Sequence, residues 1–308
     1  MQLFRRDYRL LVGKPTITDP TIDEPNYIGD GSVISGLQMK FKVVKTADSK
    51  QNKSSFEIYN LSPQTRAQFD LSKADNTNNP AILFQVRYMS DQTDSGFRTL
   101  FSGSVTGVMT VVKGADRVTM VECSDGYIPL RQGRAALTFP AGTNRLQVVQ
   151  KLASLLELPL GYVSDGGILQ NSVYQNGISI DGSIRYALDE ICGAVDVEWS
   201  VQDDTFVVTG KLFASRMKKY WISENSGMIS SPYPTKAKKS RLTGAGTPDA
   251  GVTVKTLLLP DLIPNREVII DSREFKMQTF KVDKVTHKGD FRGNNWTSTA
   301  ELLRLPST

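Results

Sequence analysis

The sequence predicts a mainly β protein with a smaller α+β module between two sheet-rich parts. Three observations support this fold class. Two stretches within residues 33–61, residues 37–43 and 56–59, alternate apolar and polar side chains with a period of two, the spacing of strands that bury one face. Residues 96–124 continue as strand, tight turn and strand with little helical pattern. Residues 142–156 and 183–194 instead carry apolar side chains at helical spacing.

The clearest stretch is a pair of strands at residues 37–44 and 55–60. In the first strand four apolar residues alternate with polar ones, and their burial would contribute roughly 6–12 kcal/mol before entropy costs. After the second strand, Ser62 fits a helix N-cap and Pro63 the first helical position. The apolar residues predicted to be buried in the first strand are Leu37, Met39, Phe41 and Val43.

The first sheet-rich part is predicted to cover residues 1–130. Gly103 and Gly107 interrupt one apolar stretch and indicate bulges or bends, as a curled antiparallel sheet needs. A tight turn is expected at residues 113–116. The further strands are expected at residues 1–11, 81–88, 96–112 and 117–124, with loops at 14–30 and 73–79.

The middle module is predicted to cover residues 131–210 and to contain two helices and a hairpin. Thr143 or Asn144 fits the N-cap of the first helix, and Asp181 or Ser183 that of the second. The hairpin strands are expected at residues 195–201 and 205–209, joined by a turn at 202–204.

The third part is predicted to be a second β domain at residues 211–308. Its first part, residues 211–251, contains several Pro and Gly residues and predicts a loop. A loop this long is uncommon in a compact domain, so the segment either contains a strand near residues 219–222 or lies against a partner. The remaining strands are expected at residues 252–259, 267–272, 279–287 and 296–303.

Several motifs resemble those of a known family. Residues 36–46 read G-L-Q-M-K-F-K-V-V-K-T, and residues 55–66 read S-F-E-I-Y-N-L-S-P-Q-T-R. Residues 280–299 contain an H-K-G-D turn followed by a tryptophan, and Asn265 stands where the family usually has glycine. The order of these motifs resembles that of the baseplate hub proteins of contractile-tailed bacteriophages. Shorter matches lie at residues 139–143, 226–232 and 257–266.

This resemblance implies two tail-tube-like antiparallel β-barrels that flank a helix–hairpin domain. It also implies a homotrimeric ring that joins the sixfold tail tube to the threefold central spike and surrounds the DNA channel. The implied partners are the tail tube protein and the central spike protein, together with tape-measure and wedge proteins, and DNA is met only in transit. The implied location is the tail baseplate of the virion, after assembly in the host cytoplasm.

The resemblance further suggests that the strand pair and the turn after it carry contacts between subunits. The polar face of the pair would then line the channel or meet a neighbour. The interface residues predicted on this basis are Leu37, Met39, Phe41, Val43, Phe56, Ile58, Tyr59, Asn60 and Leu61.

Composition sets looser limits on function. The net charge of +5 permits contact with nucleic acid or an acidic partner without indicating it. The two cysteines, Cys123 and Cys192, fall in separate predicted elements and predict neither a disulfide framework nor a metal site. Residues 1–10 lack the apolar run of a signal peptide, and no stretch has the roughly 20 apolar residues of a membrane-spanning helix.

No catalytic, cofactor-binding or metal-binding residues are predicted. His287, the only histidine, has no nucleophile or metal-ligand cluster beside it in the sequence, so a structural role near the turn bracketed by Gly289 and Gly293 is expected. A basic cluster at residues 216–219 and 236–241 is interpreted as a solvated loop. The alternative functions are a cell-wall-degrading enzyme, which would need paired carboxylates in a cleft, and a cell-wall-binding module.

Overall fold

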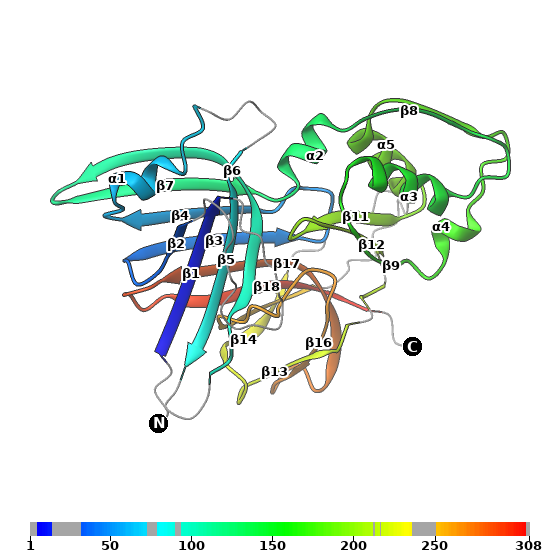
Figure 1. Ribbon diagram of the computed structural model, residues 1–308. Coiled ribbons are helices and arrows are strands. Elements are labelled where there is room, and N and C mark those ends of the chain that lie inside the picture. Colours follow the sequence, from blue (N-terminus) through cyan, green and yellow to red (C-terminus); the bar gives the residue numbers. More distant parts are fainter. Residues whose placement is uncertain are drawn as a thin grey trace. The chain divides into compact units, whose positions relative to one another are not determined.

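The structure is a computed structural model that describes residues 5–13, 32–72, 79–89, 94–211, 213–215, 217–235 and 251–305. These residues form eighteen strands and five helices, so the chain is mainly β, as the alternation predicts (Figure 1). In these ranges no helix is both long and apolar enough to cross a membrane.

The chain divides into two compact units. The predicted division into three domains at residues 130 and 210 stays a prediction. Unit 1 comprises Met1–Val44, Asn52–Ile128 and His287–Thr297, and unit 2 comprises Lys45–Gln51, Pro129–Thr286 and Ser298–Thr308.

Unit 1 contains an antiparallel sheet with the strand order β3-β4-β7-β6-β5-β1-β2. The end strands β2 and β3 are consecutive in the chain and are joined only by residues 35–38. A sheet whose first and last strands are linked so closely must curl. The elements are β1 (Arg5–Gly13), β2 (Ser32–Ile34), β3 (Met39–Thr46), β4 (Lys53–Tyr59), α1 (Pro63–Ala67), β5 (Ala81–Met89), β6 (Arg98–Lys113) and β7 (Asp116–Ser124).

Local sequence signals explain these elements. The Ser62 hydroxyl accepts a hydrogen bond from the Thr65 amide (3.0 Å), and Pro63 begins α1, as predicted. The stretch expected to hold several strands is one strand of sixteen residues, β6, with a bulge between Val105 and Gly107. The strand continues because one extra residue bends it without ending its pairing with β7. The predicted loop at 14–30 and most of that at 73–79 lie outside the described residues.

The core of unit 1 is aromatic. The Phe84 ring lies 4.8 Å from Phe41 and 5.1 Å from Phe56, measured between ring centroids. Trp296 packs edge-on against Phe41 at 5.1 Å, and Tyr8 packs against Phe84 at 6.3 Å. Aromatic pairs at these separations add to the stability that their buried area provides.

The first part of unit 2 is the predicted α+β module. The two predicted helices and the hairpin are present, and Asp203 and Asp204 form its turn with φ values of 50° and 61°. Three short strands and two short helices were not predicted. The elements are α2 (Tyr127–Gln132), β8 (Arg134–Phe139), α3 (Arg145–Leu155), β9 (Leu160–Ser164), α4 (Ile168–Asn171), β10 (Ile178–Ser183), α5 (Ile184–Gly193), β11 (Val197–Gln202) and β12 (Thr205–Gly210).

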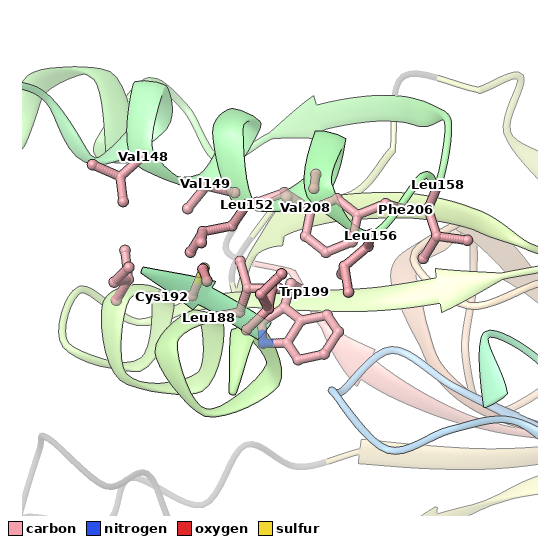
Figure 2. Close-up of a cluster of buried hydrophobic side chains, with 14 of the residues drawn as sticks. Val148, Val149, Leu152, Leu156, Leu158, Leu188, Cys192, Trp199, Phe206 and Val208 are labelled. Atoms are coloured by element: carbon pink, nitrogen blue, oxygen red, sulfur yellow. The ribbon is translucent and has the colours of Figure 1, made fainter. Parts of the chain in front are cut away.

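The module is stabilised by capping and by an aliphatic core. Of the two candidate caps of α3, Asn144 is the N-cap and forms a reciprocal capping box with Gln147. Ser183 is the N-cap residue of α5, without a hydrogen bond from its side chain. Figure 2 shows side chains of α3 and α5, among them Leu152 and Leu188, gathered with those of the hairpin strands in one cluster.

The second part of unit 2 is a sheet with the strand order β14-β15-β18-β17-β16-β13. Its end strands are again consecutive in the chain, joined only by residues 224–227. Two strands lie in the segment 211–251 that the sequence predicted as mostly loop, and residues 236–250 lie outside the described residues. The elements are β13 (Tyr220–Ser223), β14 (Met228–Thr235), β15 (Gly251–Leu257), β16 (Glu267–Asp271), β17 (Gln278–Asp290) and β18 (Trp296–Arg304).

The two sheets share one topology. In chain order, β2 to β7 correspond to β13 to β18, and the two spatial orders match once β1 is left out. In unit 1, β1 is antiparallel to both β2 and β5, so these two strands are parallel to each other, as are their counterparts β13 and β16. The sequence expectation of two similar sheet-rich parts agrees with this correspondence.

Candidate assembly interface

The predicted interface strands β3 and β4 form a regular antiparallel ladder. Met39 lies opposite Ile58 and Phe41 opposite Phe56. Their side chains point into the aromatic core of unit 1, so they are unavailable for direct contact with another subunit. Six of the nine predicted residues have at most 6% of their surface exposed: Met39, Phe41, Val43, Phe56, Ile58 and Leu61.

The other face of this ladder is polar and accessible. Lys40 lies opposite Glu57, and Lys42 lies opposite Ser55. Of the predicted residues, Leu37 and Tyr59 are half-buried and Asn60 is exposed. Whether this strand pair contacts a neighbouring subunit stays a prediction, and the face that could do so carries lysines and not the apolar residues.

The outer edge of β3 is covered by the end of β17, which enters unit 1 at His287. The Phe291 amide donates to the Met39 carbonyl (2.9 Å). The Gln38 amide group donates to the Asp290 carboxylate (2.7 Å), which also lies 3.8 Å from the Lys40 ammonium. Two motifs that lie about 250 residues apart in the sequence therefore meet at this strand edge.

The structure refines the predicted turn around the single histidine. His287 is fully buried within β17, which continues to Asp290, so the histidine lies inside the strand and not at its end. Asp290 accepts a hydrogen bond from the Gly293 amide (3.0 Å) within the turn that the sequence placed between Gly289 and Gly293. A side chain at Gly289 would collide with the ring of Phe41, which explains the glycine there.

A polar pocket of about 390 Å³ lies beside this junction in unit 1. Asn60 bridges its wall by donating to the Asp116 carboxylate (2.8 Å) and accepting from the Arg117 amide (2.9 Å). The two carboxylates that line the pocket, those of Asp116 and Asp290, thus each accept a hydrogen bond from a side-chain amide. In the described ranges no group of acidic, histidine or cysteine residues could hold a metal ion. The lining residues are Gln38, Lys40, Tyr59, Asn60, Asp116, Asp290, Arg292 and Gly293.

The most exposed apolar strand surface among the described residues of unit 1 was not predicted from the sequence. The end of β6 carries Val108, Met109 and Val112, with 36%, 55% and 69% of their surfaces exposed. The signal was present in the run V-M-T-V-V after Gly107, where apolar residues occupy both faces of the strand. Such a run does not alternate, so it predicts a strand that is covered on both sides.

A second apolar edge lies in unit 2. On β14, Ile229 and Tyr233 expose 48% and 54% of their surfaces, and Leu257 on the neighbouring β15 exposes 48%. This edge was not predicted from the sequence because Pro232 and Pro234 indicate a loop. Proline is compatible with a strand when that strand lies at the edge of a sheet, and β14 does.

The buried cysteines do not form a reactive site. Cys123 and Cys192 are free and buried. Burial raises the pKa of each thiol to about 12, so neither forms a thiolate near neutral pH.

Comparisons with known proteins agree with this architecture. The sequence model of a family described as baseplate hub gp41 matches residues 25–261, most of the chain. The 43 kDa tail protein of prophage MuSo2 from Shewanella oneidensis is similar over 97% of both chains, with a TM-score of 0.62 and 10% identity. A tail protein from Neisseria meningitidis MC58 is similar over 96% of both chains, with a TM-score of 0.59 and 11% identity.

A third similar structure comes from a secretion system. It is an E. coli component of the type VI secretion system, described as structurally similar to the T4 bacteriophage tail proteins gp27 and gp5. The match covers 88% of this chain and 74% of that one, with a TM-score of 0.56 and 10% identity. At such identities the likeness shows the fold alone. No curated protein sequence matches the chain.

Proposed function

Because the chain belongs to the baseplate hub gp41 family, we propose that it forms a trimeric ring around the DNA channel of a phage tail baseplate. The family match makes it a structural component of the baseplate. In the proposed ring, one face meets the sixfold tail tube and the other meets the threefold central spike.

The observation that carries this proposal is the shared topology of the two sheets. Each chain contributes two strand sets of the same order, β2 to β7 and β13 to β18. Three copies would present six similar bodies, each a tail-tube-like barrel, in a ring. Such a ring has approximate sixfold symmetry, which matches the tail tube, and true threefold symmetry, which matches the central spike. Head-to-tail contacts close a ring when each body offers two different complementary surfaces.

The proposed mechanism is passive and depends on shape and symmetry. The polar face of β3 and β4, with Lys40 and Lys42, is suited to line the channel or to meet a neighbour, because its side chains remain hydrated. The tape-measure and wedge proteins are further proposed partners, and DNA passes through without being read. No covalent chemistry is required of any residue.

The mass of the purified protein tests the proposal. We expect sedimentation or native mass spectrometry to find a trimer, formed by the chain alone or after its spike protein is added. A chain that remains monomeric under both conditions would contradict the hub function. Lysis of peptidoglycan in a zymogram would instead support the cell-wall-degrading alternative, and retention on purified cell wall the binding alternative.

A further inference from the structure

We propose that the outer edge of β6 pairs with the outer edge of β14 from a second copy of this chain. The inference rests on the trimeric hub proposed above and names the two strand edges that join its copies. Three observations carry it: two open edges, matching apolar side chains on them, and a strand junction within one chain that provides a template.

The first open edge is the end of β6. The strand β5 pairs with β6 only as far as Ser104, whereas β7 pairs with it as far as Lys113. Among the described residues no strand lies beside residues 106–113 on the side away from β7. An edge of this length presents backbone donors and acceptors that can pair with another chain.

The side chains of this edge indicate that it is covered in the assembled protein. Open edges are usually protected by lysine, by proline or by being short. The end of β6 is long and carries Val108, Met109 and Val112, all exposed. Left in water, such a strand would be prone to aggregate, so its sequence fits a permanent partner better than free solvent.

The second open edge is β14, which pairs only with β15 in the part of the chain that the structure describes. It also exposes apolar side chains, Ile229 and Tyr233. Pro232 and Pro234 lack amide hydrogens, so backbone pairing along this edge is best supported at residues 228–231. Both open edges therefore expose apolar side chains, and they belong to different units of the chain.

The template is the pairing of β17 with β3. In the shared topology β17 corresponds to β6, and β3 corresponds to β14. Within unit 1 the end of β17 covers the outer edge of β3, where Phe291 donates to Met39 (2.9 Å). A β6 strand that took the equivalent position on β14 of the next copy would repeat this junction, and three repeats would close a ring.

The template also sets a register. The carboxylate of Asp290, the last residue of β17, lies 3.8 Å from the ammonium group of Lys40, the second residue of β3. The equivalent arrangement places Lys113 beside Ile229, and the antiparallel direction then brings Met109 close to Tyr233, beyond the irregularity of β14 between Ser230 and Tyr233. The register thus brings together two of the side chains that a single copy leaves exposed.

Disulfide formation between copies tests this register. The single variants Met109→Cys and Tyr233→Cys are purified, mixed and oxidised, and we expect a linked dimer only in the mixture. The native cysteines are buried and do not compete. The control mixture pairs Met109→Cys with Leu155→Cys, a residue on α3 that is 41% exposed and lies on neither edge, and should give no linked dimer.

A charge introduced on the edge provides a second, independent test. We expect Val112→Glu to weaken trimer association at least tenfold in sedimentation, because a carboxylate would be buried against β14. The matched variant Leu155→Glu should leave association unchanged, and circular dichroism verifies that both variants are folded.

The outcomes separate this inference from the proposed function. A trimer that neither cross-links in the mixture nor weakens with Val112→Glu overturns the β6–β14 pairing and leaves the hub function intact. Cross-linking of Met109→Cys with itself, without Tyr233→Cys, also overturns it, because the contact would then join two β6 strands. A monomer under all conditions, with and without the spike protein, overturns both proposals.

Discussion

Unit 1 and the sheet of unit 2 build the same strand order around different cores. Unit 1 packs the rings of Phe41, Phe56, Phe84 and Trp296 against one another. The sheet of unit 2 is filled mainly by Val, Leu and Ile, with Phe280 among them. Strand order and alternation are thus common to both, while the identity of the core side chains varies. The two sheets therefore share their strand order but not the contacts in their cores.

The two sheets also differ at their edges. The edge strand β3 is covered by β17 through polar contacts such as that between Gln38 and Asp290. Its counterpart β14 has no such strand among the described residues and carries Ile229 and Tyr233 instead. The junction made within the chain thus includes polar contacts, whereas the edges proposed to meet a second copy are apolar.

The largest expected effect comes from truncating the two cores. Phe84→Ala in unit 1 should lower the free energy of unfolding by about 4 kcal/mol, because it leaves a cavity at the centre of the aromatic cluster. Ile270→Ala in unit 2 should cost about 3 kcal/mol. Urea unfolding measures both. Equal small losses at the two sites would show that the cores are less tightly packed than their burial indicates.

The second prediction compares a buried with an exposed ion pair. The fully buried Lys281 ammonium lies 3.7 Å from the Glu198 carboxylate in unit 2, whereas Lys40 is about half exposed beside Asp290 in unit 1. Glu198→Leu should cost about 3 kcal/mol, because it leaves Lys281 buried without a carboxylate or a hydrogen-bond acceptor at this position. Lys40→Met should cost less than about 1 kcal/mol. Similar losses in urea unfolding would contradict this difference.

The same pair has a predictable pH dependence. Burial raises the pKa of Glu198 above its ordinary 4.5 and lowers the pKa of Lys281. The folded protein therefore retains the Glu198 proton to a higher pH than the unfolded chain does. The stability that protonated Glu198 contributes is fully present below pH 4.5 and is lost as the pH rises through the raised pKa. Relative to Glu198→Gln, whose amide does not titrate, the wild type should accordingly lose stability as the pH rises from 4 to 7.

The third prediction compares two glycines on corresponding strands. Gly289→Ala in β17 should cost about 2 kcal/mol, because its new methyl group would collide with Phe41 and come within 2.7 Å of Trp296. Gly107→Ala in β6 should change stability by less than about 0.5 kcal/mol, because its nearest neighbour would be 3.5 Å away. Thermal unfolding distinguishes the two variants. A Gly289→Ala variant as stable as the wild type would mean that β17 packs less tightly against β3.

The smallest expected effect concerns the helix caps of the two units. Asn144→Ala removes the side-chain oxygen that accepts from the Gln147 amide in the capping box and should cost about 1 kcal/mol. Ser62→Ala in unit 1 should cost about 0.5 kcal/mol, because α1 is short and has no buried residues. Thr143→Ala serves as the control for the first substitution. A larger loss at Thr143 than at Asn144 would contradict the assigned cap.

The sequence predicted the elements whose side chains alternate or repeat regularly. The strands β3 and β4, the helices α3 and α5 and the hairpin of β11 and β12 lie close to where the pattern indicated. The short strands β8, β9 and β10 were missed because five or six residues give too few repeats of a period. The strand β14 was missed because Pro232 and Pro234 locally favour a loop, and only its place at the sheet edge permits them.

The candidate interface shows a different limit. Alternation in β3 and β4 identified Met39, Phe41 and Val43 as buried, but burial in a core and burial against a partner give the same pattern in a sequence. The structure distinguishes them, because it shows which apolar side chains remain exposed in one chain. Val112 and Tyr233 satisfy that criterion, and neither belongs to an alternating run.

The entry of β17 into unit 1 bears on the order of events during synthesis. Trp296 belongs to the aromatic cluster of the first unit, although it is synthesised long after its partner Phe41. A nascent chain would therefore hold β3 with its outer edge open until the end of β17 has left the ribosome. A chaperone that shields this edge would protect the subunit during that interval.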